Sequence, residues 1–226
     1  FLMLLIYNGV IGYMPPIEEL EDPHDKLASL VYASDDSELG RYYYGSGNRV
    51  YTDYNGISPH VINALVATED VRFREHSGID FKALGRTAIK TFLMGDKSSG
   101  GASTITQQLA KNELFTQEKQ MARKAAEMFA AWDIEDYYSK QQIFEMYAGS
   151  CYFGNQWSGV AQAAQGYFGK PTRELTRAEC VVLAGLPNAP SVYAANGELA
   201  RRRALVVVER MEPVSYTHLR AHETGA

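Results

Sequence analysis

Two polar segments set among helix-like sequence constrain this chain most strongly. The first segment, residues 69–80, reads EDVRFREHSGID, and the second, residues 100–112, reads GGASTITQQLAKN. They contain a carboxylate pair, a loop rich in Gly and Ser, adjacent glutamines and a lysine. The sequence around them has apolar residues at helical spacing, which predicts packed helices. A cluster of unlike polar groups between such helices indicates a site rather than ordinary surface.

The composition of the chain fits one sizeable globular domain. Its 226 residues are 46% hydrophobic and 22% charged, with a formal net charge of −5. This balance provides no basic footprint, so we expect no nucleic-acid partner. Cys151 and Cys180 form no CxxC pair and have no His at metal-ligand spacing, which predicts core residues, with a disulfide as the alternative.

The N-terminal part predicts an anchor remnant followed by a connector. Residues 1–14, FLMLLIYNGVIGYM, carry no charge but are fewer than the about 20 apolar residues that cross a bilayer. We expect the C-terminal part of a transmembrane anchor or of a signal sequence, with a buried helix as the alternative. Residues 15–57 alternate polar, Pro-punctuated sequence with β-type runs, and predict a juxtamembrane connector with short strands.

A candidate general base lies at the end of the first predicted helix. Ser58 and Pro59 predict the start of this helix, and its apolar stripe ends at Glu69. A carboxylate in that position is partly desolvated, which suits it to proton transfer. A helix-end Glu held by a backbone amide or an Arg is the alternative.

Three further helices are expected before residue 140. Asp80 is the predicted N-cap of the first, whose buried face should consist of Phe81, Leu84, Ala88 and Phe92. A flexible loop or lid, residues 95–102, then precedes Thr104 and Gln107, which have capping-box spacing. The free amides of such a helix N-terminus can bind an anion.

The longer helix is expected from Thr116 to about Tyr138. Its inner stripe should consist of Met121, Ala125, Met128, Phe129 and Trp132. Arg123 and Glu127 are four residues apart with Lys124 beside them, and on this helix alone a solvated ion pair is the simpler interpretation.

The remaining sequence predicts more capped helices. The capping-box pairs are Ser139 with Gln142 and Thr176 with Glu179. We expect PNAPSVY, residues 187–193, to be extended, and a final helix from about Glu198 to Met211. Residues 213–226 lose apolar periodicity, and we expect them to be a non-native tail.

Five blocks of sequence resemble the glycosyltransferase domain of class A penicillin-binding proteins, the peptidoglycan glycosyltransferases. They are EDVRFREHSGID, GASTITQQLAKN, RKAAE, KQQIFEMYAGSCYFG with its YFGK continuation, and LTRAECVVLAGLPNAPSVY. The resemblance covers about residues 17–212 and places the glycosyltransferase domain at residues 58–212. It implies a mainly α, lysozyme-like fold with a head lobe and a membrane-proximal jaw lobe. It also implies polymerisation of lipid II into glycan strands, with inversion at the anomeric carbon and release of undecaprenyl pyrophosphate.

The resemblance implies roles for individual residues. Glu69 would be the general base, Asp70 the residue beside it, and Glu127 the second glutamate, which orients cations or helps to hold a divalent ion (Mg²⁺ or Mn²⁺) at the pyrophosphate. No other cofactor is expected. The implied substrate-binding residues are Asp70, Ser103, Gln107, Gln108, Lys111, Lys119, Arg123 and Lys124. His76 and Gly78 are expected to shape the turn that aims Glu69.

Two positions depart from the family pattern. Lys119 stands where members usually have Arg, which keeps the charge but loses bidentate phosphate binding. Residues 147–149 read Tyr-Ala-Gly instead of Tyr-Leu-Asn, which affects the packing of the fourth block. The chain contains no Ser-x-x-Lys and no Lys-Thr-Gly transpeptidase motif.

The implied setting is the outer, periplasmic side of the cytoplasmic (inner) membrane, on a single-pass anchor. The implied partners are lipid II, the growing glycan strand, the membrane and other cell-wall synthesis proteins. Two alternatives stay open: a lysozyme-like, glycan-cleaving enzyme, and an inactive scaffold that binds lipid II.

Overall fold

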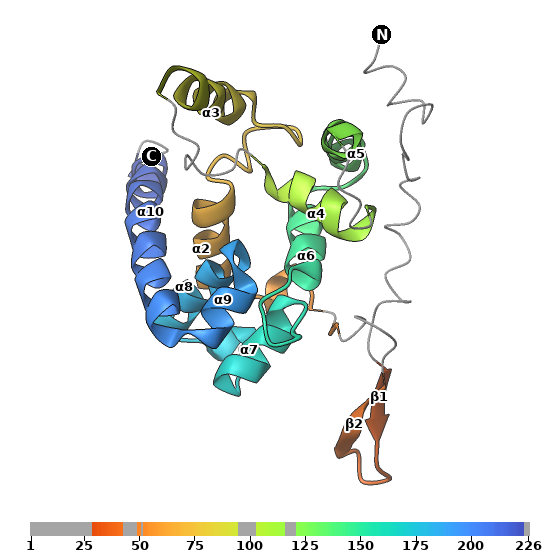
Figure 1. Cartoon of the computed structure of the whole chain (residues 1–226). Coiled ribbons are helices and arrows are strands. Elements are labelled where there is room, and N and C mark those ends of the chain that lie inside the picture. The colour runs from red at the N-terminus through yellow and green to blue at the C-terminus, as the bar shows by residue number, and fades with distance from the viewer. Residues whose placement is uncertain (1–28, 43–48, 51, 95–102, 116–120, 224–226) are drawn as a thin grey trace. The chain divides into compact units, whose positions relative to one another are not determined.

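The computed structural model describes residues 29–42, 49–50, 52–94, 103–115 and 121–223. Most of these residues lie in helices, which confirms the mainly α class (Figure 1). Contacts divide the chain into two compact units. We name their described parts the central unit (residues 72–147) and the flanking unit (residues 29–71 and 148–223), after their order in the sequence.

A short hairpin opens the flanking unit. Strand β1 (Ser29–Tyr32) pairs with strand β2 (Glu38–Tyr42) in the antiparallel sense. Short strands are therefore present where the connector, residues 15–57, was expected to have them. The expected anchor, residues 1–14, lies outside the described residues, and no helix within the described ranges is both long enough and apolar enough to span a bilayer.

Three helices form the core of the flanking unit. The unit contains η3 (Tyr54–Gly56), α2 (Pro59–Glu69), α7 (Val160–Phe168), η4 (Thr172–Glu174), α8 (Arg177–Gly185), η5 (Leu186–Asn188), α9 (Pro190–Ala195) and α10 (Gly197–Glu223). Helices α2, α8 and α10 pack against one another (Figure 1). The side chains at 0% exposure in these helices include Val61, Leu65, Cys180, Leu183 and Val207. Cys151 is 4% exposed, so the prediction that both cysteines are core residues is confirmed.

The C-terminal part differs from expectation in two places. Residues 187–188 and 190–193 are helical rather than extended, and Pro187 and Pro190 lie near the first positions of η5 and α9, where a missing N–H costs no hydrogen bond. Helix α10 begins at Gly197 and continues to Glu223, so its expected end at Met211 is wrong. The expected end rested on the loss of apolar periodicity after Met211, but the backbone continues as a helix without that periodicity.

The capping box of α8 leads to a pH-dependent prediction. Glu179 accepts hydrogen bonds from Lys170 Nζ at 2.9 Å and from the Thr176 N–H at 2.7 Å. These bonds, that of Lys170 foremost, lower the pKa of Glu179 from 4.5 to about 2. A group whose pKa is lowered by folding stabilises the fold above its unfolded pKa, and this contribution is lost as the pH falls through the folded pKa.

We therefore expect Glu179→Gln to lower Tm at neutral pH, and the Tm difference from wild type to shrink as the pH falls from about 5 to about 3. Gln keeps the cap but loses the charge. Thermal unfolding over this pH series measures the effect, with the exposed Glu174→Gln as control. A Tm difference that does not change with pH would contradict the assignment.

The central unit is built from four helices. They are α3 (Phe81–Met94), α4 (Ile105–Glu113), α5 (Met121–Tyr137) and α6 (Lys140–Ser150), the last of which continues into the flanking unit. Helices α4 and α5 pack together, with Ile105, Leu109, Ala131 and Ile134 at 0% exposure. The ring of Phe73 lies 6.4 Å from that of Phe144, which joins the segment before α3 to α6. The expected capping box at Ser139 and Gln142 is present.

The start of α3 is confirmed, but its buried face is not. Asp80 accepts a hydrogen bond from the Ala83 N–H at 2.8 Å and another from Arg72 Nε at 3.0 Å. Burial opposes ionisation of Asp80, but these bonds outweigh it and hold the pKa of Asp80 below its ordinary value. Phe81 and Leu84 are 62% and 42% exposed and Ala88 is exposed, whereas the side chain of Phe92 lies outside the description. Periodicity predicts an apolar face but not a partner to cover it.

The inner face of α5 also differs from expectation. Trp132 is 47% exposed, and Ala125, Met128 and Phe129 are only half-buried, whereas the side chain of Met121 is not described. The buried positions are Ala126, Glu127, Ala130, Ala131 and Ile134. Small side chains allow α4 to approach α5 closely, so the bulky residues lie at the edges of the contact.

Candidate active site

Glu69 and Asp70 end helix α2 in the flanking unit. Glu69 is the last helical residue and Asp70 is the C-cap. Leu65, one turn before Glu69, is fully buried, whereas Glu69 is half-buried and Asp70 is 7% exposed. The structure therefore confirms a carboxylate at the end of a core-facing stripe.

A contact from α10 holds this end of α2. Arg210 Nη1 donates a hydrogen bond to the carbonyl oxygen of Thr68 at 2.7 Å. The last carbonyls of a helix have no partner within it, and a cation there also complements the helix dipole. Sequence reasoning missed Arg210, because its partner is a backbone atom 142 residues earlier in the chain.

The N-terminus of α4 is capped as predicted. The Thr104 hydroxyl accepts a hydrogen bond from the Gln107 N–H at 3.1 Å, and Gln107 Oε1 accepts one from the Thr104 N–H at 3.3 Å. Thr104 Oγ1 also donates to the carbonyl of Gly78 at 2.5 Å. The side-chain oxygen of Gln107 therefore serves the cap, and the predicted substrate contact of this residue would come from its amide nitrogen.

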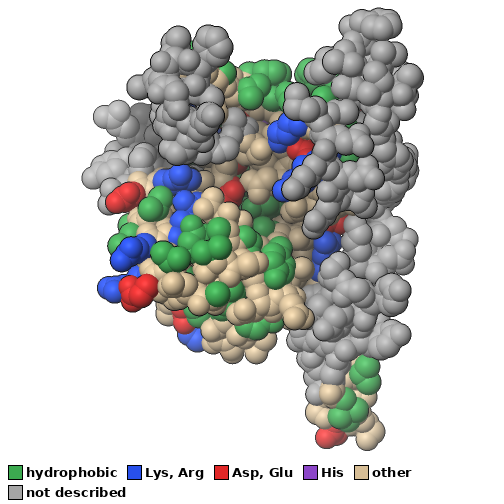
Figure 2. All heavy atoms as spheres, viewed as in Figure 1, with side chains coloured by type: hydrophobic (Ala, Val, Ile, Leu, Met, Phe, Trp, Pro, Cys, Tyr) green, Lys and Arg blue, Asp and Glu red, His purple; other side chains and the backbone are tan. Residues whose placement is uncertain are grey.

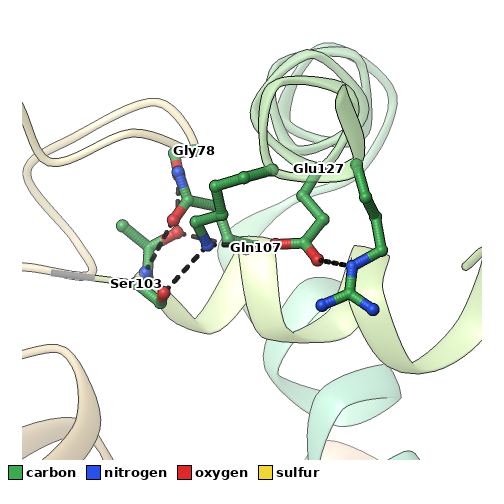
Figure 3. Close-up of polar contacts among 7 residues, drawn as sticks. Gly78, Ser103, Gln107 and Glu127 are labelled. Carbon is green, nitrogen blue, oxygen red and sulfur yellow. Dashed lines mark hydrogen bonds and ion pairs between the residues drawn. The ribbon is translucent and has the colours of Figure 1, made fainter. Parts of the chain in front are cut away.

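Four predicted site residues meet beside this cap, and we name them the Lys124 cluster: Ser103, Arg123, Lys124 and Glu127. Lys124 Nζ lies 2.9 Å from Ser103 Oγ and 3.0 Å from Glu127 Oε2. Arg123 Nε lies 3.0 Å from the other carboxylate oxygen, Oε1 (Figure 3). Helix α5 thus contributes two cations, and the segment directly before α4 contributes a hydroxyl, to one place.

The burial of Glu127 corrects the simpler interpretation of this ion pair. Its side chain is 3% exposed, whereas that of Lys124 is 53% exposed. A buried carboxylate is costly unless cations pair with it, so Glu127 is held by the cluster and also holds Arg123 and Lys124 in place. Oε1 lies close to Arg123 without hydrogen-bond geometry, so that contact is chiefly electrostatic.

The charge of the Lys124 cluster favours an anion. Its two cations and one carboxylate leave one formal positive charge, next to the helix N-terminus of α4, which carries a partial positive charge of its own. On the face that Figure 2 shows, both Lys or Arg and Asp or Glu side chains are present. Local geometry, rather than the net charge of the chain, therefore creates the candidate anion site.

Two further predicted substrate-binding residues, Gln108 and Lys111, lie on α4. Gln108 is half-buried on α4. Lys111 is exposed in the last turn of α4, at the end of that helix opposite Ser103, so the structure does not bring it into the Lys124 cluster. Lys119 lies outside the described residues.

The residues around Glu127 offer a poor set of ligands for a divalent cation. Both of its oxygens face cations already. Among the described residues there is no group of three or more His, Cys, Asp or Glu side chains that could hold a metal. Mg²⁺ needs oxygen ligands in near-ideal octahedral geometry. A protein-held ion therefore does not fit here, and an ion held mainly by substrate phosphates stays a prediction.

Comparison with known proteins identifies the family. Residues 35–212 match the Transglycosylase family. Penicillin-binding protein 1A of Escherichia coli (strain K12) is 37% identical over 215 residues, covering 93% of this chain and 25% of that protein. Penicillin-binding protein 1A of Neisseria gonorrhoeae is 38% identical over 200 residues, covering 88% of this chain and 25% of that protein.

The chain therefore spans about a quarter of the length of these relatives. A crystal structure of penicillin-binding protein 1A from Haemophilus influenzae matches with a TM-score of 0.45 at 23% identity, over 84% of this chain and 19% of that one. The family match covers more than half of the sequence and includes all five blocks that carry the resemblance. The chain belongs to the Transglycosylase family, the glycosyltransferase domain of class A penicillin-binding proteins.

Proposed function

We propose that this chain polymerises lipid II into glycan strands and releases undecaprenyl pyrophosphate. Membership of the Transglycosylase family supports the reaction class. One structural observation supports the site: the buried carboxylate of Glu127 fixes two cations beside Ser103 and the N-terminus of α4. This arrangement suits the pyrophosphate of a lipid-linked sugar.

The reaction sets different demands on Glu69 and on the Lys124 cluster. The 4-hydroxyl of the acceptor sugar forms a bond to the anomeric carbon of the growing strand, while the bond from that carbon to the pyrophosphate oxygen breaks, with inversion. Glu69 takes the hydroxyl proton, because an alcohol is a weak nucleophile without a base. The pyrophosphate is already a good leaving group, so its charge has to be neutralised rather than protonated.

Lys124 is suited to that neutralisation. Its ammonium donates to Ser103 and to Glu127, and an ammonium has three N–H donors, so one remains for a phosphate oxygen. Its exposed side chain is held in position before substrate arrives, and pre-organised charge is the usual source of such stabilisation.

Lipid II is membrane-borne, which supports a reaction at the outer surface of the cytoplasmic membrane. The growing strand and other cell-wall synthesis proteins are the partners that this setting suggests. The membrane anchor belongs to the same proposal.

Labelled lipid II tests the reaction directly. We expect the chain to convert it into a ladder of glycan polymers on a gel, and a phosphoglycolipid of the moenomycin type to suppress the ladder by competing for the donor site. The matched control is finished glycan, which should stay intact because cleavage leaves no pyrophosphate to bind. Shortened strands without polymer would replace the proposal by a glycan-cleaving activity.

A further inference from the structure

We propose that Lys140, which lies outside the Lys124 cluster, is a positioning residue for it. Lys140 acts through Glu135 and through the backbone carbonyl of His76, and together these hold the first turn of α4 against α5. The inference rests on the proposed function, because the Lys124 cluster is the proposed pyrophosphate site.

Lys140 is held at three points. Its Nζ donates to the His76 carbonyl at 2.6 Å and to Glu135 Oε1 at 2.7 Å. It also lies 4.5 Å from the centroid of the Phe73 ring, a cation–π distance. The side chain of Glu135 is 6% exposed and that of Lys140 is 28% exposed, so the carboxylate is desolvated and the ammonium is partly desolvated. Such pairs add little net stability, and they are better explained by the single arrangement that they enforce.

Both acceptors of Lys140 lead to the first turn of α4. Glu135 Oε1 also accepts a hydrogen bond from Thr106 Oγ1 at 2.6 Å, and Thr106 is fully buried. Gly78 follows His76 by two residues, and its carbonyl accepts from Thr104 Oγ1 at 2.5 Å. The Lys140 ammonium therefore holds both Glu135, which binds the Thr106 hydroxyl, and the 76–78 segment, which binds the Thr104 hydroxyl.

The first turn of α4 sets the distance between Ser103 Oγ and Lys124 Nζ in the Lys124 cluster. Ser103 directly precedes Thr104, and its hydroxyl lies 2.9 Å from Lys124 Nζ, which comes from α5. A shift of the 76–78 segment or of Glu135 would move Ser103 relative to Lys124. Because a misplacement of about 1 Å at a reacting site can cost as much as 10²-fold in rate, a residue that prevents the shift affects catalysis without touching substrate.

The test compares Lys140→Met with the conservative Lys140→Arg in the whole chain. We expect Lys140→Met to reduce kcat/KM for labelled lipid II by about tenfold or more, and Lys140→Arg to retain most of the activity. In a Lys124→Met background, Lys140→Met should cause little further loss, because the cluster that it positions is already impaired. Should Lys140→Met fail to fold, the Lys140→Met/Glu135→Gln pair replaces it, because this pair leaves no buried charge without a partner.

Binding of inorganic pyrophosphate, measured by calorimetry, separates this inference from the proposed function. Weaker binding to Lys140→Met than to wild type supports positioning even if the wild type makes no polymer, an outcome that would refute only the proposed function. A folded Lys140→Met variant with a lower Tm but with wild-type pyrophosphate binding and wild-type kcat/KM would show a purely structural ion pair and overturn the inference. If Lys140→Met lowers kcat/KM by the same factor in the wild-type and in the Lys124→Met background, the inference is overturned as well.

Discussion

Replacing Glu69 by Gln is expected to lower kcat for glycan polymerisation by about 10²- to 10⁴-fold, the usual contribution of a general base. Glu69 ends the apolar stripe of α2 and is half-buried, and the amide keeps its size while it cannot take a proton. Binding of lipid II should persist, since the phosphates are assigned to the Lys124 cluster. Initial rates with labelled lipid II, together with a binding titration, measure both quantities.

Glu75→Gln is the matched control for this substitution. It makes the same chemical change at an exposed carboxylate in the same sequence block, and we expect wild-type rates. Equal product from wild type and Glu69→Gln would remove Glu69 from the mechanism. Lipid II binding without polymer from the wild type itself would favour the inactive scaffold.

The largest expected effect on stability comes from Gly78→Ala, which should lower the free energy of unfolding by about 2–5 kcal/mol. Gly78 has a backbone φ angle of 77°, a conformation that residues other than Gly rarely adopt. A Cβ placed there would lie 2.5 Å from the carbonyl oxygen of Ala131 and 2.8 Å from its carbonyl carbon. These are backbone atoms of α5, so the segment rather than a flexible side chain would have to move.

Gly85→Ala provides the contrasting substitution. Gly85 lies inside α3 and a Cβ there would have no atom within 4 Å, so Ala should stabilise the helix by about 0.5–1 kcal/mol. Urea unfolding of both variants measures the difference. Stability of Gly78→Ala equal to that of the wild type would show that the 76–78 segment does not pack against α5. Because Thr104 Oγ1 donates a hydrogen bond to the Gly78 carbonyl, Gly78→Ala should also disturb the N-terminal cap of α4.

The features that could be predicted from sequence depend on residues within one helical turn. The capping boxes at Thr104 and Thr176 and the cap at Asp80 are present as expected, because a cap is made by a side chain and an amide three residues away. The position of Glu69 at the end of a stripe follows from helical periodicity in the same way. The family resemblance also came from contiguous blocks, and the Transglycosylase match confirms it.

Tertiary structure decided which of these groups are buried and what they contact. Glu127 looked like half of a solvated pair, but it is 2% exposed on a helix that packs against α4. The described part of the apolar face of α3 is exposed. Sequence periodicity could not predict this, since it does not specify a covering partner. Lys140 and Arg210 bind backbone carbonyls 64 and 142 residues earlier in the chain. A carbonyl is the same in every residue, so no side-chain pattern in the sequence marks such a partner, and only the folded backbone places it within reach.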